Sequence, residues 1–183
     1  MMAALGSSPG GSGALRALGS SPGGELPDAV ADALDRAYRY LGHRDRTERE
    51  MRSHLERAGI EAGTVQSAVR ILTELEYLDD ARFAVRFTHD KRELEAWGAE
   101  RIERRLTALG VERDHIRAAL AEEEGGTELD RALALLRKRF PAPPEDRRSR
   151  DRALGVLLRK GYEPDLALEA LAAHAGAGRR VVR

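Results

Sequence analysis

The sequence contains no cysteine. Disulfides and thiolate-bound metal sites are therefore excluded, and such a chain suits a reducing compartment. No hydrophobic run approaches the ~18 residues that indicate a membrane-spanning helix. The opening residues, MMAALGSSPGG, form neither a basic segment nor an apolar one, so export is not expected. We therefore expect a cytoplasmic protein that does not contact a membrane.

Proline is absent from the 113 residues between Asp28 and Phe140. This stretch is rich in Ala, Leu, Arg and Glu, and its glycines are spaced like helix ends. Aromatic residues make up only 4% of the chain, and no segment alternates apolar and polar residues as a strand does. The sequence therefore predicts an all-α fold. The expected helices lie near 28–41, 47–58, 62–76, 79–95, 98–109, 112–124, 127–139, 146–160 and 164–174.

One spacing of leucine, glycine and a following apolar residue occurs three times. A leucine near a helix end, a left-handed glycine and an apolar residue together form a helix C-cap, so each copy predicts a helix-turn-helix pair. An additional helix precedes each pair, and we expect three tandem three-helix repeats over 28–78, 79–125 and 126–175. The three copies are Leu55, Gly59 and Ile60; Leu106, Gly110 and Val111; and Leu157, Gly161 and Tyr162.

The two ends of the chain have a different composition. The octapeptide ALGSSPGG starts at Ala4 and again at Ala17. Such a segment cannot bury enough apolar surface to offset the entropy of ordering it, so residues 1–27 are predicted to be a disordered tail. Residues 176–183 form a short basic end.

Two adjacent carboxylates, Asp79 and Asp80, stand between two helical patterns. They could form a catalytic or metal-binding pair, or they could begin a helix. The five histidines are scattered singly, and a short three-helix repeat offers little room for a buried cleft. We favour helix capping, because a carboxylate at this position accepts free backbone N–H groups and suits the helix dipole. The pair is then a hinge between the first and second repeats.

Motifs of common enzymes are also missing. The sequence has no phosphate-binding loop, dinucleotide fingerprint, zinc-protease motif or serine-hydrolase motif. Thr47 and Glu50 match a capping box instead, in which each residue bonds the backbone N–H of the other. We therefore expect a binding protein without enzyme activity, cofactor or metal.

Charge is balanced overall, with 31 basic and 31 acidic residues, but it is segregated. Residues 137–160 hold nine basic residues and three acidic ones. These side chains could be ordinary solvated faces that pair with nearby glutamates. Stripes on successive repeats instead favour an extended surface for a long polymeric partner such as a filament or nucleic acid. The proposed binding residues are Arg82, Arg86, Arg101, Arg104, Arg105, Arg148, Arg152 and Arg159.

The run YLDDARFA from Tyr77 to Ala84, with the pattern from Gly98 to Val111 after it, resembles the RecX family of recombination regulators. The RDRT run that begins at Arg44 adds to this resemblance. Within these runs the signature residues are Tyr77, Asp79, Asp80, Phe83, Gly98 and Gly110.

The RecX resemblance implies a fold and a partner. It implies an elongated, curved monomer of three three-helix repeats. Such a protein would bind the groove of the filament that the RecA recombinase forms on single-stranded DNA. It would limit filament growth, ATP hydrolysis and strand exchange, and weak direct DNA binding is a further expectation.

The alternative is a helix-turn-helix regulator that reads the major groove of duplex DNA with a helix such as 98–109. Two features count against it. The helix pair recurs three times, and no short polar recognition helix stands apart from the others.

Overall fold

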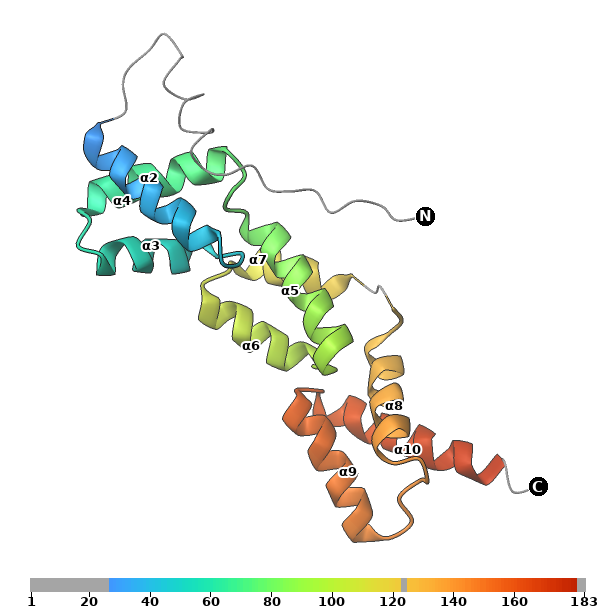
Figure 1. Ribbon diagram of the computed structural model, residues 1–183. Helices are drawn as coiled ribbons and strands as arrows, with labels where there is room; N and C mark the ends of the chain where they lie inside the picture. The colour runs from blue at the N-terminus through green and yellow to red at the C-terminus, as the bar shows by residue number, and fades with distance from the viewer. Residues whose placement is uncertain (1–26, 123–124, 181–183) are drawn as a thin grey trace, which may run out of the picture. The chain divides into compact units, whose positions relative to one another are not determined.

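The computed structural model describes residues 27–122 and 125–180, with side chains described up to residue 176 (Figure 1). All regular structure within these ranges is helical, which confirms the predicted all-α fold. The predicted tail at 1–27 lies outside the described residues except for Pro27, as do the last residues of the basic end. The helices are α2 Asp28–Leu41, α3 Glu48–Arg57, α4 Ala62–Glu74, α5 Asp80–Glu95, α6 Ala99–Leu109, α7 Arg113–Ala121, α8 Glu128–Arg139, α9 Arg147–Lys160 and α10 Pro164–Arg180.

Most helix boundaries fall within two residues of those expected from sequence. The last helix is the main exception, because α10 continues to Arg180 rather than ending near residue 174. The segment from Ala173 to Gly178 is mostly alanine and glycine without proline, so no residue in it stops the helix. The prediction from sequence therefore ended this helix too early.

The first repeat consists of α2, α3 and α4, which pack on one another around one core (Figure 1). On α3, Met51 and Leu55 are fully buried one turn apart. The apolar stripe of a helix has this spacing, and burying each large side chain contributes ~1.5–3 kcal/mol. The buried residues of α2 and of α4 both recur at i, i+3, i+4 and i+7: Val30, Ala33, Leu34 and Ala37, then Val65, Ala68, Val69 and Leu72.

The second repeat, α5 to α7, and the third, α8 to α10, each have a core of their own. In the second, α7 packs on both α5 and α6; in the third, α10 packs on both α8 and α9. His174 on α10 is buried, and its Nε2 lies 2.9 Å from the carbonyl oxygen of Phe140, where α8 ends. The second core contains Phe83, Ala84, Ile102, Leu106, Val111, Ile116 and Ala119. The third contains Ala132, Leu135, Leu136, Ala153, Leu157, Tyr162, Ala167 and Ala170.

The three predicted C-caps all form, and they have the same geometry. Gly59, Gly110 and Gly161 have φ of 79°, 90° and 86°, the left-handed conformation that glycine adopts without strain. In every copy the apolar residue after the glycine donates its N–H to the carbonyl of the leucine five residues earlier. The distances are 3.2 Å for Ile60 to Leu55, 3.1 Å for Val111 to Leu106 and 3.2 Å for Tyr162 to Leu157.

The chain divides into two compact units between Asp79 and Asp80. The first unit contains the first repeat, and the second contains the other two. Helix α5 begins at Asp80, so Asp79 occupies the position just before it, as the capping prediction requires. The expected hinge between the first two repeats stays a prediction.

Candidate partner-binding surface

The first arginine stripe lies on helix α5. Phe83, Ala84 and Thr88 are buried on one side of this helix, and Phe83 stacks on Phe87 with ring centroids 5.9 Å apart. Arg82 and Arg86, one turn apart, are exposed. The 3.6-residue period thus separates an apolar face from a basic one, and both arginines reach solvent.

The second stripe, on helix α6, is divided between two roles. Ile102 and Leu106 are fully buried, whereas Arg104 and Arg105 are exposed. Arg101 is only partly exposed: its guanidinium lies 4.1 Å from the centre of the Trp97 ring, and its Nη1 donates to the carbonyl of Arg159 at 2.9 Å. Helical spacing grouped the three arginines as one partner-binding set. In the structure, however, Arg101 contacts Trp97 and Arg159 of the same protein.

The contact of Arg101 belongs to a junction between the second and third repeats, at the first turn of α6. A helix leaves its first N–H groups without partners in the helix itself. Here the N–H of Gly98 donates to the carbonyl of Lys160 at 2.9 Å, and that of Glu100 to the carbonyl of Gly161 at 3.2 Å. The N–H of Ala99 donates to Oε1 of Glu128 at 2.8 Å. The third repeat therefore caps a helix of the second.

Two glycines make this approach possible. A Cβ atom on Gly98 would lie 2.3 Å from the carbonyl oxygen of Gly161. One on Gly161 would lie 2.3 Å from the Cβ of Arg101. Separations of this size are far inside van der Waals contact, and neither atom can move aside, because one belongs to the backbone and the other, a Cβ, is fixed to it. Gly98, which the sequence identified as a signature residue, is required by close packing between the two repeats.

Charged side chains cap the C-terminal ends of α5 and α7 near this junction. Nζ of Lys160 donates to the carbonyl of Glu95 at 2.5 Å, where α5 ends. Arg92 donates to the carbonyls of Leu120 and Glu122 at 2.8 and 2.6 Å. Burial lowers the pKa of Arg92, and the positive charge of Arg131 lowers it further. Burial raises the pKa of Tyr162 to about 12, so this phenol stays neutral.

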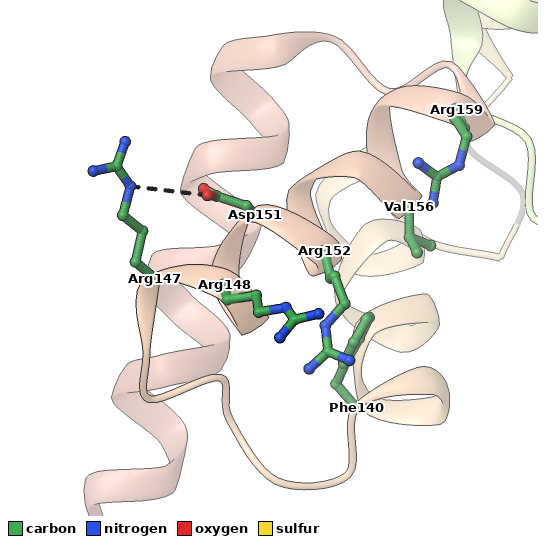
Figure 2. Close-up of a pocket in the computed structure, with 7 residues that line it drawn as sticks. All are labelled: Phe140, Arg147, Arg148, Asp151, Arg152, Val156 and Arg159. Carbon is green, nitrogen blue, oxygen red and sulfur yellow. Dashed lines mark ion pairs between the residues drawn. The ribbon is translucent and has the colours of Figure 1, made fainter.

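The third stripe lies on helix α9, where the arginines line an open hollow of about 630 Å³ (Figure 2). Arg148 and Arg152 point toward one another beside the ring of Phe140, while Arg147 turns away and pairs with Asp151 at 3.9 Å. Val156 and Arg159 lie farther along the same helix. The structure thus brings together the three predicted arginines of this helix and adds Phe140 and Arg147, which sequence reasoning had not assigned to the surface.

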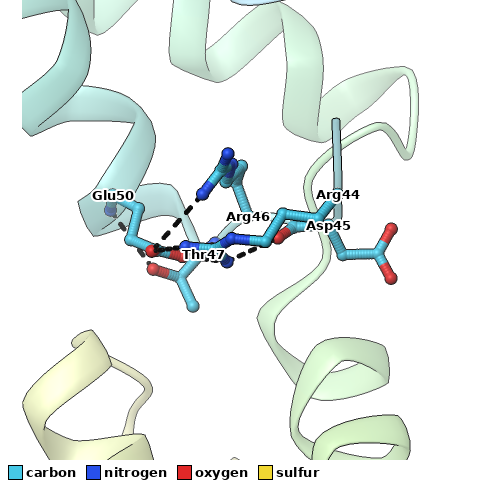
Figure 3. Close-up of polar contacts among 5 residues, drawn as sticks. All are labelled: Arg44, Asp45, Arg46, Thr47 and Glu50. Atoms are coloured by element: carbon cyan, nitrogen blue, oxygen red, sulfur yellow. Dashed lines mark hydrogen bonds and ion pairs between the residues drawn. The ribbon is translucent and has the colours of Figure 1, made fainter. Parts of the chain in front are cut away.

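The first repeat carries a polar cluster that the sequence only partly indicated (Figure 3). The capping box is confirmed, since Thr47 Oγ1 accepts from the Glu50 N–H at 3.2 Å and Glu50 accepts from the Thr47 N–H at 3.3 Å. Arg44 adds a two-point contact to the Glu50 carboxylate. Burial alone would raise the pKa of Glu50, but the bonds from Arg44 and Thr47 outweigh it and lower that pKa.

Tyr40, on α2, contacts both this cluster and helix α3. The Arg46 guanidinium lies 3.8 Å from the centre of the Tyr40 ring, and the His54 ring stacks on Tyr40 with centroids 3.9 Å apart. Burial lowers the pKa of His54, and the charges of Arg57 and Arg46 act in the same direction. In the sequence, this cluster is indicated by two arginines, Arg44 and Arg46, that come just before the capping-box residue Thr47.

The signature residues Tyr77, Asp79 and Asp80 lie around the start of α5. Tyr77 is exposed and meets Tyr38 edge to face at 5.1 Å. Asp79 and Asp80 are half-buried at the start of α5.

Among the described residues, no group of three histidines or carboxylates could hold a metal ion. Over the same residues, no helix is both long and apolar enough to cross a membrane.

Comparison with family models covers each repeat separately. The first three-helix domain of RecX matches residues 33–70, the second matches 79–120, and the third matches 127–171. Each of the three cores described above therefore corresponds to one RecX domain.

Two proteins named regulatory protein RecX are similar in sequence. The relative from Listeria monocytogenes serotype 4a is 27% identical over 142 residues, which cover 76% of this chain and 53% of the relative. The relative from Mycobacterium sp. (strain JLS) is 28% identical over 153 residues, 78% of this chain and 84% of the relative. The chain thus spans about half the length of the Listeria relative.

Solved structures agree on the fold. A crystal structure of RecX from Lactobacillus salivarius is similar with a TM-score of 0.71 and 19% identity, covering 81% of this chain and 98% of that one. A second crystal structure, of a regulatory protein RecX, gives a TM-score of 0.63 at 21% identity, covering 85% of this chain and 82% of that one. With three tandem repeats matched in order by the three RecX domains, this chain belongs to the RecX family.

Proposed function

We propose that this chain inhibits a RecA-type recombinase by binding the filament that the recombinase forms on single-stranded DNA. Binding in the filament groove would limit filament growth, ATP hydrolysis and strand exchange. Membership of the RecX family and the regulatory relatives support this role. The chain would act as a monomeric binding protein, without chemistry of its own.

The observation that carries the proposal is the set of exposed arginines on α6 and α9. Arg104 and Arg105 on α6 reach solvent, as do Arg148 and Arg152 on α9. The two helices belong to one compact unit, and the backbone of α6 is hydrogen-bonded to the end of α9. Two basic patches at a fixed spacing suit a partner that repeats regularly, as a filament does.

Energetics favour many weak contacts over one strong one. An exposed ion pair contributes only ~0–1 kcal/mol, so a single arginine adds little. Several such contacts along a filament add together, and each becomes weaker as salt rises. Inhibition should therefore fall steeply with ionic strength.

The test is the DNA-dependent ATPase of the cognate recombinase, measured with increasing amounts of this protein. Arg104 and Arg105 are the residues to reverse, because neither takes part in the contact that Arg101 makes with Trp97 and Arg159. The double variant Arg104→Glu, Arg105→Glu should inhibit at least ~10-fold less well, which corresponds to about 1.4 kcal/mol. Helical content and melting temperature should not change.

The matched control is Arg113→Glu with Arg117→Glu on α7, which makes the same change of charge at two exposed positions. It should inhibit like the wild type. Equal inhibition by the Arg104/Arg105 variant and the wild type at low salt would exclude α6 from the interface. A shift of one defined duplex by the protein alone, without recombinase, would support the helix-turn-helix regulator instead.

A further inference from the structure

The hollow on α9 contains more positive charge than its surroundings balance. Four arginines and one carboxylate line it, and that carboxylate, Asp151, pairs with Arg147. Within the described part of the chain, Arg148, Arg152 and Arg159 form no ion pair with a carboxylate. Asp146 lies near Arg152, but its carboxylate is the N-cap of α9 and accepts the Ser149 N–H at 2.7 Å.

Helix α9 departs from ordinary helix design at the same positions. Its first turn contains no acidic residue, and Arg147 and Arg148 stand at the positive end of the helix dipole. Arg148 and Arg152 are like charges one turn apart, a spacing that destabilises a helix slightly. Local conflicts of this kind are typical of functional sites.

A glycine in the middle of α9 is a further departure. Glycine weakens the interior of a helix relative to alanine. A Cβ on Gly155 would lie 3.1 Å from Nη1 of Arg159, so its absence leaves room for the Arg159 side chain along the helix surface. This glycine allows a third guanidinium to lie next to the hollow.

The shape and the wall of the hollow suggest the kind of ligand. Its volume of about 630 Å³ lies within the ~300–1,000 Å³ of small-ligand sites. Phe140 forms an aromatic wall, and its backbone is held by bonds to Leu136 and His174. A guanidinium group can donate two parallel hydrogen bonds to a phosphate, and aromatic rings stack on nucleic-acid bases.

We propose that this hollow binds a nucleotide, with its phosphate on Arg148 and Arg152 and its base against Phe140. Arg159 would contact a second phosphate or neutralise the field of the first. The same chemistry is offered by a free nucleoside triphosphate and by one unit of a single strand. The site requires no recombinase, so it can be tested apart from the function proposed above.

The test uses the full chain alone in fluorescence anisotropy titrations with two probes, a fluorescent ATP analogue and a fluorescent oligothymidylate. At least one probe should bind the wild type, and the probe that binds identifies the source of the nucleotide. The double variant Arg148→Ala, Arg152→Ala should weaken its binding by at least ~10-fold, because two charge-assisted contacts are lost. Arg113→Ala with Arg117→Ala, an equal loss of charge elsewhere, should bind like the wild type.

Phe140→Leu tests the base contact and keeps an apolar side chain near the third core. It should weaken binding of the probe while leaving competition by inorganic pyrophosphate unchanged. The proposal is overturned if neither probe binds the wild type, or if the double arginine variant binds as tightly as the wild type. It is also overturned if polyglutamate displaces the probe as effectively as unlabelled nucleotide does, since the hollow would then select only negative charge.

Discussion

Helix α3 of the first repeat and helix α6 of the second repeat are capped at their N-terminal ends in different ways. In the first repeat, α3 is capped by Thr47 and Glu50, which are three residues apart in sequence. In the pair formed by the second and third repeats, the first turn of α6 is bonded to Glu128, Lys160 and Gly161, up to 62 residues away. Helices α8 and α9 of the pair also have local caps, from Thr127 with Asp130 and from Asp146, so it is the start of α6 that depends on another repeat.

The bonds at the start of α6 join the second and third repeats, which belong to one compact unit, whereas the first repeat forms the other unit. Free N–H groups at a helix start must find acceptors, and in α6 the acceptors come from another repeat. Changes at the junction should therefore affect two repeats together. Changes in the first repeat should remain local to it.

The largest effect is expected from a matched pair of glycine substitutions. Gly59 and Gly161 have nearly the same left-handed conformation, so Gly59→Ala and Gly161→Ala incur the same backbone strain of ~1–2 kcal/mol. A Cβ on Gly59 meets nothing within 4 Å, whereas one on Gly161 overlaps Arg101. Overpacking of this kind costs a further ~1–3 kcal/mol.

Denaturant unfolding of both variants measures this difference directly. Gly161→Ala should lower the free energy of unfolding by more than Gly59→Ala, by the overpacking cost alone. Equal losses in the two variants would mean that the second and third repeats do not approach as closely as described.

A smaller effect is expected from Arg101→Lys. Lysine keeps the charge but cannot both stack flat on Trp97 and reach the Arg159 carbonyl, so stability should fall by ~1 kcal/mol. Trp97 is the only tryptophan in the chain, and its emission should change with the loss of this contact. Arg105→Lys on the same helix is the control and should leave both stability and emission as in the wild type.

The next change tests the local cap of the first repeat. Thr47→Ala removes the acceptor of the Glu50 N–H and should cost ~1 kcal/mol, whereas Thr47→Ser should cost much less. Trp97 emission in the folded state should be unaffected, because Trp97 lies in the second repeat. An altered emission in Thr47→Ala would show that the first repeat is coupled to the junction.

The smallest effect is a dependence on pH. The pKa of Glu50 is lower in the folded protein than in an unfolded chain, so its ionised form stabilises the fold. That contribution is complete above the ordinary glutamate pKa of about 4.3 and is lost as pH falls through the lower, folded value. Because the pair with Arg44 is partly exposed, the gain should stay well under ~1 kcal/mol.

Glu50→Gln tests this dependence through melting temperatures measured at several pH values. Stability of the variant should fall less steeply below pH 4 than that of the wild type. Parallel curves for the two proteins would assign the acid sensitivity to other carboxylates, such as Asp146, whose pKa is lowered by its bond from the Ser149 N–H.

Local signals made much of this fold predictable from sequence. Helix periodicity, the capping box at Thr47 and the C-cap glycines at Gly59, Gly110 and Gly161 depend on residues a few positions apart, and all appear in the structure. The RecX resemblance was likewise confirmed.

Long-range contacts were not predictable in the same way. The sequence grouped Arg101 with Arg104 and Arg105, because helical spacing cannot reveal that Arg159 lies beside one of them. Gly98 stood out as a signature residue, but its reason, the backbone of Gly161, comes from a different repeat. The hollow on α9 likewise depends on Phe140, which folding brings up to the helix from the end of α8.

Amide hydrogen exchange at the first turns of α6 and α4 tests most directly whether the third repeat caps the second. Neither helix has a side-chain cap at its N-cap residue, so their first amides would normally exchange alike. We predict that the amides of Gly98, Ala99 and Glu100 exchange at least ~10-fold more slowly than those of Ala62 and Gly63, after correction for intrinsic rates. Equally fast exchange at the two helix starts would contradict the junction between the second and third repeats.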